Sequence, residues 1–377
     1  MDAADAPQLA LAKTDGKPEP PAMNPALETL MLAFAADGLP VPQRALFLGA
    51  EPHADLAGWP QVTGWQPFKP KADAWDNAGL TRTSAPEGTW PLVMVLPGKS
   101  RDEALHWFAL AHDLLEPGGT LLVAMPNTAG AARFEKELSQ AAGEIRSIQK
   151  HKCRAFHAVK SPSWNQALLE EWRSLGGRRS IPDTRFTTEA GIFSADHIDP
   201  GSKLLVAHLP ASLRGKAADL GAGWGYLTDA LLKRCPKITS VDLYEADARA
   251  LACAERNLAE YQRGLGEKDD PLSLESPACM VADEIPLTFH WDDVTKGLPE
   301  RYDIILMNPP FHTGQATDVD LGRAFIRVAA CALNRGGKLL LVANRQLPYE
   351  AELSALKFSW RKVAEDHVYK LLFADQR

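Results

Sequence analysis

The chain of 377 residues is 45% hydrophobic and 24% charged, an ordinary globular composition, and its net charge is −7. It contains no run of about 18 apolar residues, which excludes a transmembrane helix, and its five cysteines form no C-x-x-C pair, which argues against a zinc ribbon or a disulfide framework. We therefore expect a cytoplasmic protein of about two domains that works without a metal ion.

The chain begins with a predicted tail, and strands then alternate with helices. Residues 1–25 are rich in Ala, Pro, Lys and Asp and lack the apolar segment of a signal peptide, so we expect a disordered tail. Apolar runs and helical spacing predict a helix at 24–37, strands at 45–50, 92–96 and 121–124, and a helix at 102–115. Such alternation predicts a parallel sheet covered by helices.

A basic segment follows between Ile145 and Arg185. It holds nine basic and three acidic residues, a charge of +6, so the rest of the chain carries −13. Contacts to nucleic acid phosphates need a local positive field and not a basic protein. The segment is either such a contact surface or a basic interdomain linker. Its candidate phosphate contacts are Lys150, Lys152, Arg154, Arg178, Arg179 and Arg185.

The second half contains a glycine-rich turn between a short apolar entry and a predicted helix at 226–235. Glycines let the chain turn sharply from strand to helix and allow a ligand to touch the backbone. Taken alone, the pattern suits a dinucleotide equally well. We expect a cofactor to contact Asp219, Gly221, Gly223 and Gly225.

Acidic residues end the next two predicted strands. The first of these strands ends in Glu245, about twenty residues after the last glycine, where an acid suits the two hydroxyls of a ribose. Asp242 is a rival candidate, although alternation along the strand can turn it to the other face. The strand at 287–291 ends in Asp292 and Asp293, which are placed to accept a hydrogen bond from an adenine amino group.

The apolar run at 302–307 predicts a buried strand that ends in Asn308, Pro309, Pro310 and Phe311. Open α/β sheets bind ligands at the carboxyl ends of their strands. The prolines remove two backbone donors. The Asn308 oxygen and the Pro309 carbonyl can then accept from one planar amino group while Phe311 stacks on its ring. A plain Pro-Pro turn is the alternative; we assign the four residues to catalysis.

These motifs, in this order, resemble the class I S-adenosylmethionine-dependent methyltransferases, and the Asn-Pro-Pro-Phe sequence resembles the signature of enzymes that methylate exocyclic amino groups. More narrowly, five segments resemble the ribosomal RNA guanine-N2 methyltransferase family: 191–194, 199–205, 308–312, 336–344 and 347–349. The resemblance implies S-adenosylmethionine as the cofactor, with Asn308 touching both cofactor and substrate. It also places His312 among the RNA contacts.

The two halves of the chain share an order of motifs. Three pairs of segments correspond: 48–52 with 220–224, 95–98 with 307–310, and 115–124 with 333–343. The first half lacks the glycines and the Asn-Pro-Pro-Phe sequence, which indicates an internal duplication whose amino-terminal copy has lost its cofactor site. The alternative is that any two α/β halves share a helix, a Gly-Gly turn and a strand.

We therefore expect an α/β fold with two Rossmann-like methyltransferase domains in tandem, the amino-terminal one degenerate and the carboxyl-terminal one with a seven-stranded, mostly parallel sheet. The predicted divisions are a tail at 1–25, a degenerate domain at 26–160, a linker at 161–183 and a catalytic domain at 184–377. A polar insertion at 264–286 is either a flap on the substrate side or a surface loop.

The resemblance implies transfer of a methyl group from S-adenosylmethionine to the N2 amino group of a guanine in ribosomal RNA. A DNA adenine or cytosine amino-methyltransferase shares the central motif, but no target-recognition domain is evident. A non-catalytic RNA-binding assembly protein fits the first half of the chain and not the second. We expect a monomer that acts on ribosomal RNA or a ribosomal subunit and binds neither metal nor membrane.

Overall fold

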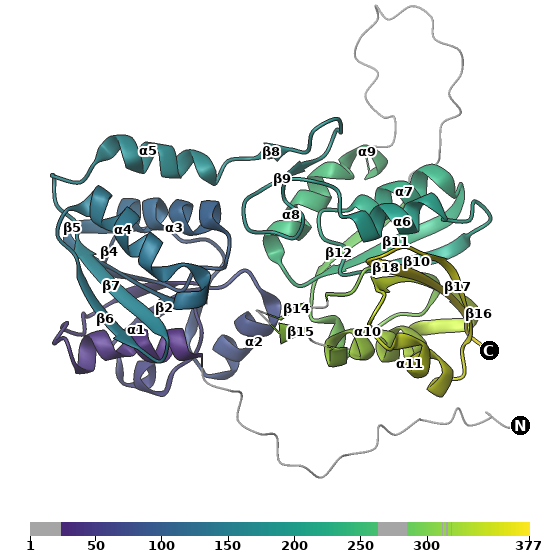
Figure 1. The fold of residues 1–377 in the computed structure, drawn as a ribbon, viewed down its shortest axis with the longest axis horizontal. Helices are drawn as coiled ribbons and strands as arrows, with labels where there is room; N and C mark the ends of the chain where they lie inside the picture. Colours follow the sequence, from purple (N-terminus) through teal and green to yellow (C-terminus); the bar gives the residue numbers. More distant parts are fainter. Residues whose placement is uncertain (1–23, 263–284, 311, 314–315, 318) are drawn as a thin grey trace, which may run out of the picture.

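The computed structural model describes residues 24–262, 285–310, 312–313, 316–317 and 319–377. It consists of two α/β units that lie side by side in Figure 1. The predicted tail up to residue 23 and the predicted insertion up to residue 284 lie outside the described residues. Within the described part of the chain, no helix is long and apolar enough to cross a membrane, and no three His, Cys, Asp or Glu side chains gather to hold a metal ion.

The first unit is a sheet with the strand order β3-β2-β1-β4-β5-β7-β6. Strands β1 to β5 are parallel, whereas β7 runs antiparallel to β5 and to β6. The strands are β1 (Ala45–Leu48), β2 (Val62–Trp65), β3 (Thr81–Thr83), β4 (Trp90–Val95), β5 (Leu115–Pro126), β6 (Arg146–Lys150) and β7 (Cys153–Val159). The helices are α1 (Pro25–Ala35), η1 (Ala54–Gly58), α2 (Lys69–Asn77), α3 (Arg101–Leu114), η2 (Asn127–Ala129), α4 (Ala131–Ala142) and α5 (Gln166–Leu175).

The second unit repeats this topology with the order β12-β11-β10-β13-β16-β18-β17. Its strands are β10 (Arg214–Leu220), β11 (Lys237–Glu245), β12 (Leu287–Trp291), β13 (Tyr302–Met307), β16 (Leu333–Asn344), β17 (Ser359–Glu365) and β18 (Tyr369–Asp375). Its helices are α6 (Pro200–Ala207), α7 (Tyr226–Arg234), α8 (Ala248–Asn257), α9 (Ala259–Gln262), η3 (Val294–Lys296), α10 (Val319–Ala332) and α11 (Tyr349–Ala355). Two short hairpins complete the chain: β8 (Arg179–Ser180) with β9 (Thr187–Thr188), and β14 (His312–Thr313) with β15 (Ala316–Thr317).

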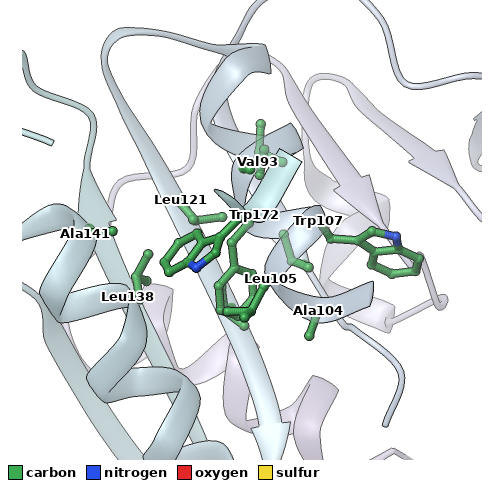
Figure 2. Packing of buried hydrophobic residues seen from close by; sticks show 14 of the residues in the cluster. Val93, Ala104, Leu105, Trp107, Leu121, Leu138, Ala141 and Trp172 are labelled. Atoms are coloured by element: carbon green, nitrogen blue, oxygen red, sulfur yellow. The ribbon is translucent and has the colours of Figure 1, made fainter. Parts of the chain in front are cut away.

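Helix α5 belongs to the core of the first unit, although the sequence predicts an interdomain linker at 161–183. Trp164, Leu169 and Trp172 are buried in the same cluster as residues of α3, β4 and β5. Figure 2 shows the Trp172 ring close to Leu121 of β5. One apolar helix face buries this much surface because its large side chains recur at helical spacing. We therefore propose that the boundary between the units lies after α5, inside the predicted linker.

The glycine turn of the second unit has a degraded counterpart in the first. The N–H groups of Gly221 and the next residue both donate to the Tyr244 carbonyl, at 2.9 and 3.0 Å. The N–H groups of Gly49 and the next residue donate in the same way to the Trp65 carbonyl, at 2.9 and 3.2 Å. The same backbone device therefore closes the end of the first strand in both units.

The space at the first turn is filled, whereas the space at the second is free. A Cβ on Gly49 would meet the Leu96 carbonyl oxygen, and Trp107 lies 3.0 Å from the same point. Phe325, which has the same position in α10 that Trp107 has in α3, lies 3.7 Å from the corresponding point of Gly221. A Cβ on Gly223 would meet nothing within 4 Å. Room for a ligand therefore exists at the second turn, whereas the first is blocked.

The two units meet through equivalent loops, which follow β2 and β11. The Lys69 N–H donates to the Ala246 carbonyl at 2.8 Å, and the Ala248 N–H donates to the Pro67 carbonyl at 2.9 Å. Pro67 and Ala246 are equivalent, because each lies two residues beyond the carbonyl that accepts from its own glycine turn. Reciprocal contacts between equivalent positions are the pattern of a two-fold symmetric dimer. The chain therefore has the architecture of a dimer fused end to end.

Candidate active site

An open pocket lies at the carboxyl ends of β10 and β13. Open α/β sheets bind their ligands at this edge. Of the predicted site residues, Gly221, Gly223 and Asn308 line the pocket. The other residues of its wall are Phe193, Ser194, Asp199, Ser202, Ala222, Trp224, Tyr226 and Leu227.

The glycine turn brings bare backbone to this pocket, with a buried carboxyl group behind it. Gly221, Gly223 and Gly225 have φ values of +73°, +56° and +92°, which other residues rarely adopt. Asp219 is fully buried; its Oδ2 accepts from the Thr228 hydroxyl at 2.8 Å, and its Oδ1 has no hydrogen-bond partner among the described residues. Burial raises the pKa of Asp219 to about 7. The unpaired Asp219 Oδ1 close to the open glycine turn fits a ligand that donates a hydrogen bond to it.

Glu245 fixes the loop that follows β11. Its Oε2 accepts from the Gly223 N–H and its Oε1 from the Asp247 N–H, both at 2.8 Å. Burial raises the pKa of Glu245 to about 7, against the opposing effect of these two backbone donors. Each oxygen keeps a second lone pair, so the carboxylate can accept from a diol while it holds the glycine turn. This geometry fits the ribose role predicted for Glu245.

Asp242 points to a different environment. It is buried, and its Oδ2 accepts from the Tyr302 hydroxyl at 2.7 Å and lies 3.0 Å from Lys216 Nζ. Its neighbours along the strand alternate between the two faces of the sheet, so a residue three positions before Glu245 faces away from it. Asp242 is therefore committed to an internal ion pair, and Glu245 is the better candidate for the ribose.

The two predicted adenine contacts differ in their structural duties. The Oδ1 of Asp293 accepts from the Thr295 N–H at 3.0 Å and from its hydroxyl at 2.6 Å, which caps η3. The Oδ1 of Asp292 accepts from the Asp293 N–H at 2.8 Å, and the Asp292 N–H donates to the Glu245 carbonyl at 3.1 Å. Neither side chain lines the pocket. Asp292 stays a candidate, whereas the Asp293 side chain already serves as a helix cap.

The Asn308 amide is held by two acceptors from another element. Its Nδ2 donates to Asp199 Oδ2 at 2.8 Å and to Ser202 Oγ at 2.9 Å, both at the start of α6. With both amino hydrogens engaged, Oδ1 is the atom left to accept a hydrogen bond in the pocket. Pro309 is buried and Pro310 exposed. Phe311 lies outside the described residues, so its predicted stacking role stays a prediction.

Eight pocket residues were not predicted as site members, and four of them come from outside the glycine turn, namely Phe193, Ser194, Asp199 and Ser202. Phe193 is 57% exposed, which is unusual for a large apolar side chain. Asp199 caps α6 by accepting from the Ser202 N–H at 2.7 Å, ahead of a proline at the first helical position. The Asp-Pro-Gly-Ser sequence indicates this helix start, but only the fold brings it next to Asn308.

The chain is similar in sequence to known methyltransferases. The Methyltransferase small domain family matches residues 183–267 and 273–373. The ribosomal RNA small subunit methyltransferase C of Psychromonas ingrahamii is 27% identical over 76% of this chain and 76% of its own. The protein of the same name from Shewanella oneidensis is 31% identical over 75% of this chain and 77% of its own. The chain belongs to the ribosomal RNA small subunit methyltransferase C family.

A solved structure matches both units of this chain. The T. thermophilus 16S rRNA N2 G1207 methyltransferase, in complex with AdoMet and guanosine, superposes with a TM-score of 0.73. It is 25% identical and covers 94% of this chain and 93% of its own. The predicted fold of two tandem Rossmann-like units and the predicted family are thereby confirmed.

In this member of the methyltransferase C family, half of the predicted basic RNA contacts are engaged within the protein. The ion pairs are Arg154 with Glu135, Arg179 with Asp102 and Asp196, and Arg185 with Asp229 and Glu260. Lys150, Lys152 and Arg178 are exposed and form no ion pair with any described residue. The His312 side chain is outside what the structure describes. Lys150, Lys152 and Arg178 are therefore the predicted phosphate contacts without an ion pair among the described residues, and His312 stays a prediction.

Neutralising Asp219 should stabilise the folded protein and weaken its cofactor site. Because burial raises the pKa of this carboxyl from 3.8 to about 7, the folded state loses stability as the pH rises through that interval. At pH 8 we expect Asp219→Asn to raise the free energy of unfolding by about 1–3 kcal/mol, below the roughly 4 kcal/mol that the full shift represents. Urea unfolding at about pH 4 and pH 8 measures the difference in the free energy of unfolding between variant and parent, and this difference should vanish at the lower pH.

Asp242→Asn is the matched control, because it neutralises a buried carboxylate that has an ion-pair partner. This variant should lose stability at pH 8. Equal losses in both variants would show that the Asp219 carboxylate has a satisfied environment in the folded protein.

Proposed function

We infer that the protein transfers a methyl group from S-adenosylmethionine to the exocyclic N2 amino group of a guanine in ribosomal RNA. The observation that carries this proposal is the Asn308 amide, whose amino group is fully engaged by Asp199 and Ser202, so that its oxygen is left to accept from a substrate amino group. Membership of the methyltransferase C family and the match to a structure holding AdoMet and guanosine support it.

The residues around the pocket fit S-adenosylmethionine, which supplies an electrophilic methyl group when bound. We propose that the Glu245 carboxylate accepts from the ribose hydroxyls and that the turn of Gly221 and Gly223 lies along the backbone of the methionine part. Asp219, whose Oδ1 is buried without a described partner, would balance the positively charged end of that part. Asp292 would accept from the adenine amino group.

Catalysis by this chain rests on orientation of the substrate amine. The lone pair of a guanine amino group is delocalised into the ring, which makes the nitrogen a poor nucleophile. Acceptance of its two hydrogens by Asn308 Oδ1 and the Pro309 carbonyl favours a pyramidal nitrogen with a directed lone pair. Orientation of this kind is worth up to about 7–11 kcal/mol. Extrusion of the base from its helix costs a few kcal/mol.

The direct test is methylation of ribosomal RNA with labelled cofactor, followed by mass mapping of the modified nucleotide. We expect a guanine to gain one methyl group on N2, and the same nucleotide to lack it in RNA from a strain without this protein. Duplex DNA should not be labelled. Labelling of DNA adenine or cytosine in place of ribosomal RNA would contradict the proposal, as would firm cofactor binding with no methylation of either ribosomal subunit or its free RNA.

We further propose that the first unit helps to hold the RNA, and that the protein acts as a cytoplasmic monomer. The first unit already occupies the face that a symmetric partner of the second unit would cover. Lys150 ends β6 and Lys152 lies in the turn between β6 and β7, at the sheet edge away from the second unit in Figure 1. Contacts there would extend the RNA footprint across the whole first unit.

Reversing these two charges should weaken RNA binding without touching the cofactor site. We expect the Lys150→Glu, Lys152→Glu double variant to bind ribosomal RNA roughly tenfold more weakly at about 0.1 M salt and to lower the slope of log affinity against log salt by about 1–2. Filter binding across a salt series measures both. The control is Lys237→Glu. Lys237 is exposed at the amino-terminal end of β11, away from the cofactor site, so this variant should bind RNA nearly as the parent protein does. An unchanged slope in the double variant would remove the first unit from the RNA interface.

A further inference from the structure

The Asn308 amide lies in a fixed frame built by a different part of the chain. Asp199, which accepts from it, is 7% exposed and 109 residues away in sequence. The carboxylate is itself held, because its Oδ2 also accepts from the Ser202 N–H at 2.7 Å and its Oδ1 lies 3.5 Å from the Tyr369 hydroxyl. Helix α6, which begins here, packs on β16 and β18 of the same sheet. The acceptor of the Asn308 amino group therefore cannot move freely.

An asparagine amide has two ends of nearly the same size and opposite hydrogen-bonding character. If the Asn308 amide turned over, its oxygen would face the Asp199 carboxylate and its amino group would face the pocket. A carboxylate has no hydrogen to donate, so that arrangement sets two acceptors against each other. Ser202 does not make this choice, because a hydroxyl can either donate or accept. The Asp199 carboxylate alone therefore discriminates between the two orientations.

We propose that Asp199 is a positioning residue that locks the Asn308 amide with its oxygen toward the group that receives the methyl. This lock restricts the site to methyl-receiving groups that donate hydrogen bonds. An amino group offers two hydrogens to Asn308 Oδ1 and the Pro309 carbonyl, whereas a ring nitrogen or a carbonyl oxygen offers none. The carboxylate also polarises the amide toward negative charge on Oδ1, where positive charge develops on the substrate nitrogen. This proposal rests on the proposed function and specifies how its central residue is set.

The test is a double-mutant cycle that exchanges the two functional groups. Asp199→Asn keeps a good helix cap but allows Asn308 to turn over, and we expect kcat to fall about 10- to 100-fold with the cofactor Kd within about threefold. Asn308→Asp sets two carboxylates against each other and should lower kcat further. In the doubly exchanged protein, the amide now at position 199 donates to the carboxylate now at position 308, whose second oxygen faces the pocket. The kcat of this double variant should exceed that of Asn308→Asp by about tenfold or more.

The sign reversal is the decisive readout: Asp199→Asn lowers kcat in the parent protein and raises it in the Asn308→Asp variant. A purely structural role for Asp199 would make the two substitutions additive, with the double variant the least active, and that result would overturn the proposal. Ser202→Ala removes one acceptor but leaves the carboxylate, so its kcat should fall less than fivefold, or about 1 kcal/mol. A larger loss in Ser202→Ala than in Asp199→Asn would also overturn the lock.

A readout without catalysis separates this proposal from the proposed function. In protein labelled with ¹⁵N-asparagine, the side-chain amide signal of Asn308 is the one lost in Asn308→Asp. We expect one sharp pair of amide protons in the parent protein and a shifted or doubled pair in Asp199→Asn. A doubled pair in the parent protein would refute the lock. If the parent shows one fixed amide yet fails to methylate ribosomal RNA, the lock stands and the proposed function fails.

Discussion

Replacement of Asn308 by alanine should lower kcat by about 10²- to 10³-fold and leave the cofactor Kd within about threefold. The amide oxygen is the acceptor that the Asp199 and Ser202 contacts leave free, and no hydrogen bond among the described residues links Asn308 to the glycine turn or to Glu245. Its removal therefore takes away an interaction with the substrate amine and not a support of the cofactor site. Single-turnover methylation with labelled cofactor measures kcat, and titration calorimetry measures the Kd.

Asn334→Ala is a suitable control, because Asn334 lies on the neighbouring strand β16 at the amino-terminal end of the sheet, where it donates to Asp303 at 2.9 Å. Its kcat should stay near that of the parent protein. The assignment of roles would be overturned by a folded Asn308→Ala protein that loses cofactor binding but turns over normally at saturating cofactor.

Substitution of Glu245 by alanine should weaken cofactor binding by about 10- to 150-fold, the equivalent of roughly 1.5–3 kcal/mol for hydrogen bonds to a charged group. Two effects combine, since the carboxylate is placed to accept from a diol and also holds the Gly223 N–H at 2.8 Å. Affinity should also depend on pH, because burial raises the pKa of Glu245 and that of Asp219 to about 7, and protonation of either carboxyl below that pH removes a negative charge from the cofactor site.

Glu245→Gln removes one of these two titrating carboxyls, so its affinity should be lower and should fall less steeply than that of the parent protein as the pH drops from about 7 to 5.5. Asp242→Ala is the matched control: it breaks contacts to Tyr302 and Lys216 inside the sheet, so stability should fall while the cofactor Kd changes less than in Glu245→Ala. The reverse order of affinities by calorimetry would assign the ribose to Asp242.

The first unit keeps the hydrogen bonds that hold the loop of a cofactor site but lacks the carboxylate. Gln66 takes the place of Glu245, and its Oε1 accepts from the Phe68 N–H at 3.0 Å, as Glu245 Oε1 accepts from the Asp247 N–H. Its Nε2 donates to the Ala50 carbonyl at 2.9 Å, so no carboxylate is left for a ribose. The retained loop now pairs with the cofactor loop of the second unit. The loop that carries Glu245 in the second unit therefore has an equivalent in the first unit that serves as a support for it.

The sequence by itself determined the alternation of strands and helices in both units and the turn that opens the site. Apolar runs, glycines at strand ends and the repeated Gly-Gly turns predict two parallel α/β units in tandem, because these signals depend on residues that are neighbours along the chain. Gly221 and Asn308 follow buried strands directly, so their place at one sheet edge also follows from strand direction. The sequence could not decide between Asp242 and Glu245 as the ribose contact, because that choice depends on the register of a single strand end.

Only the tertiary structure decided which side chains face one another. The Asp199 contact to Asn308 joins the start of α6 to the end of β13 across 109 residues, and no local pattern predicts it. The same holds for Arg154, Arg179 and Arg185, whose acidic partners turn a basic stretch of sequence into internal ion pairs. Packing of α5 against the first core likewise depends on a surface that other strands create. Local sequence sets backbone conformation, whereas pairing of distant charges and amides is settled when the sheets assemble.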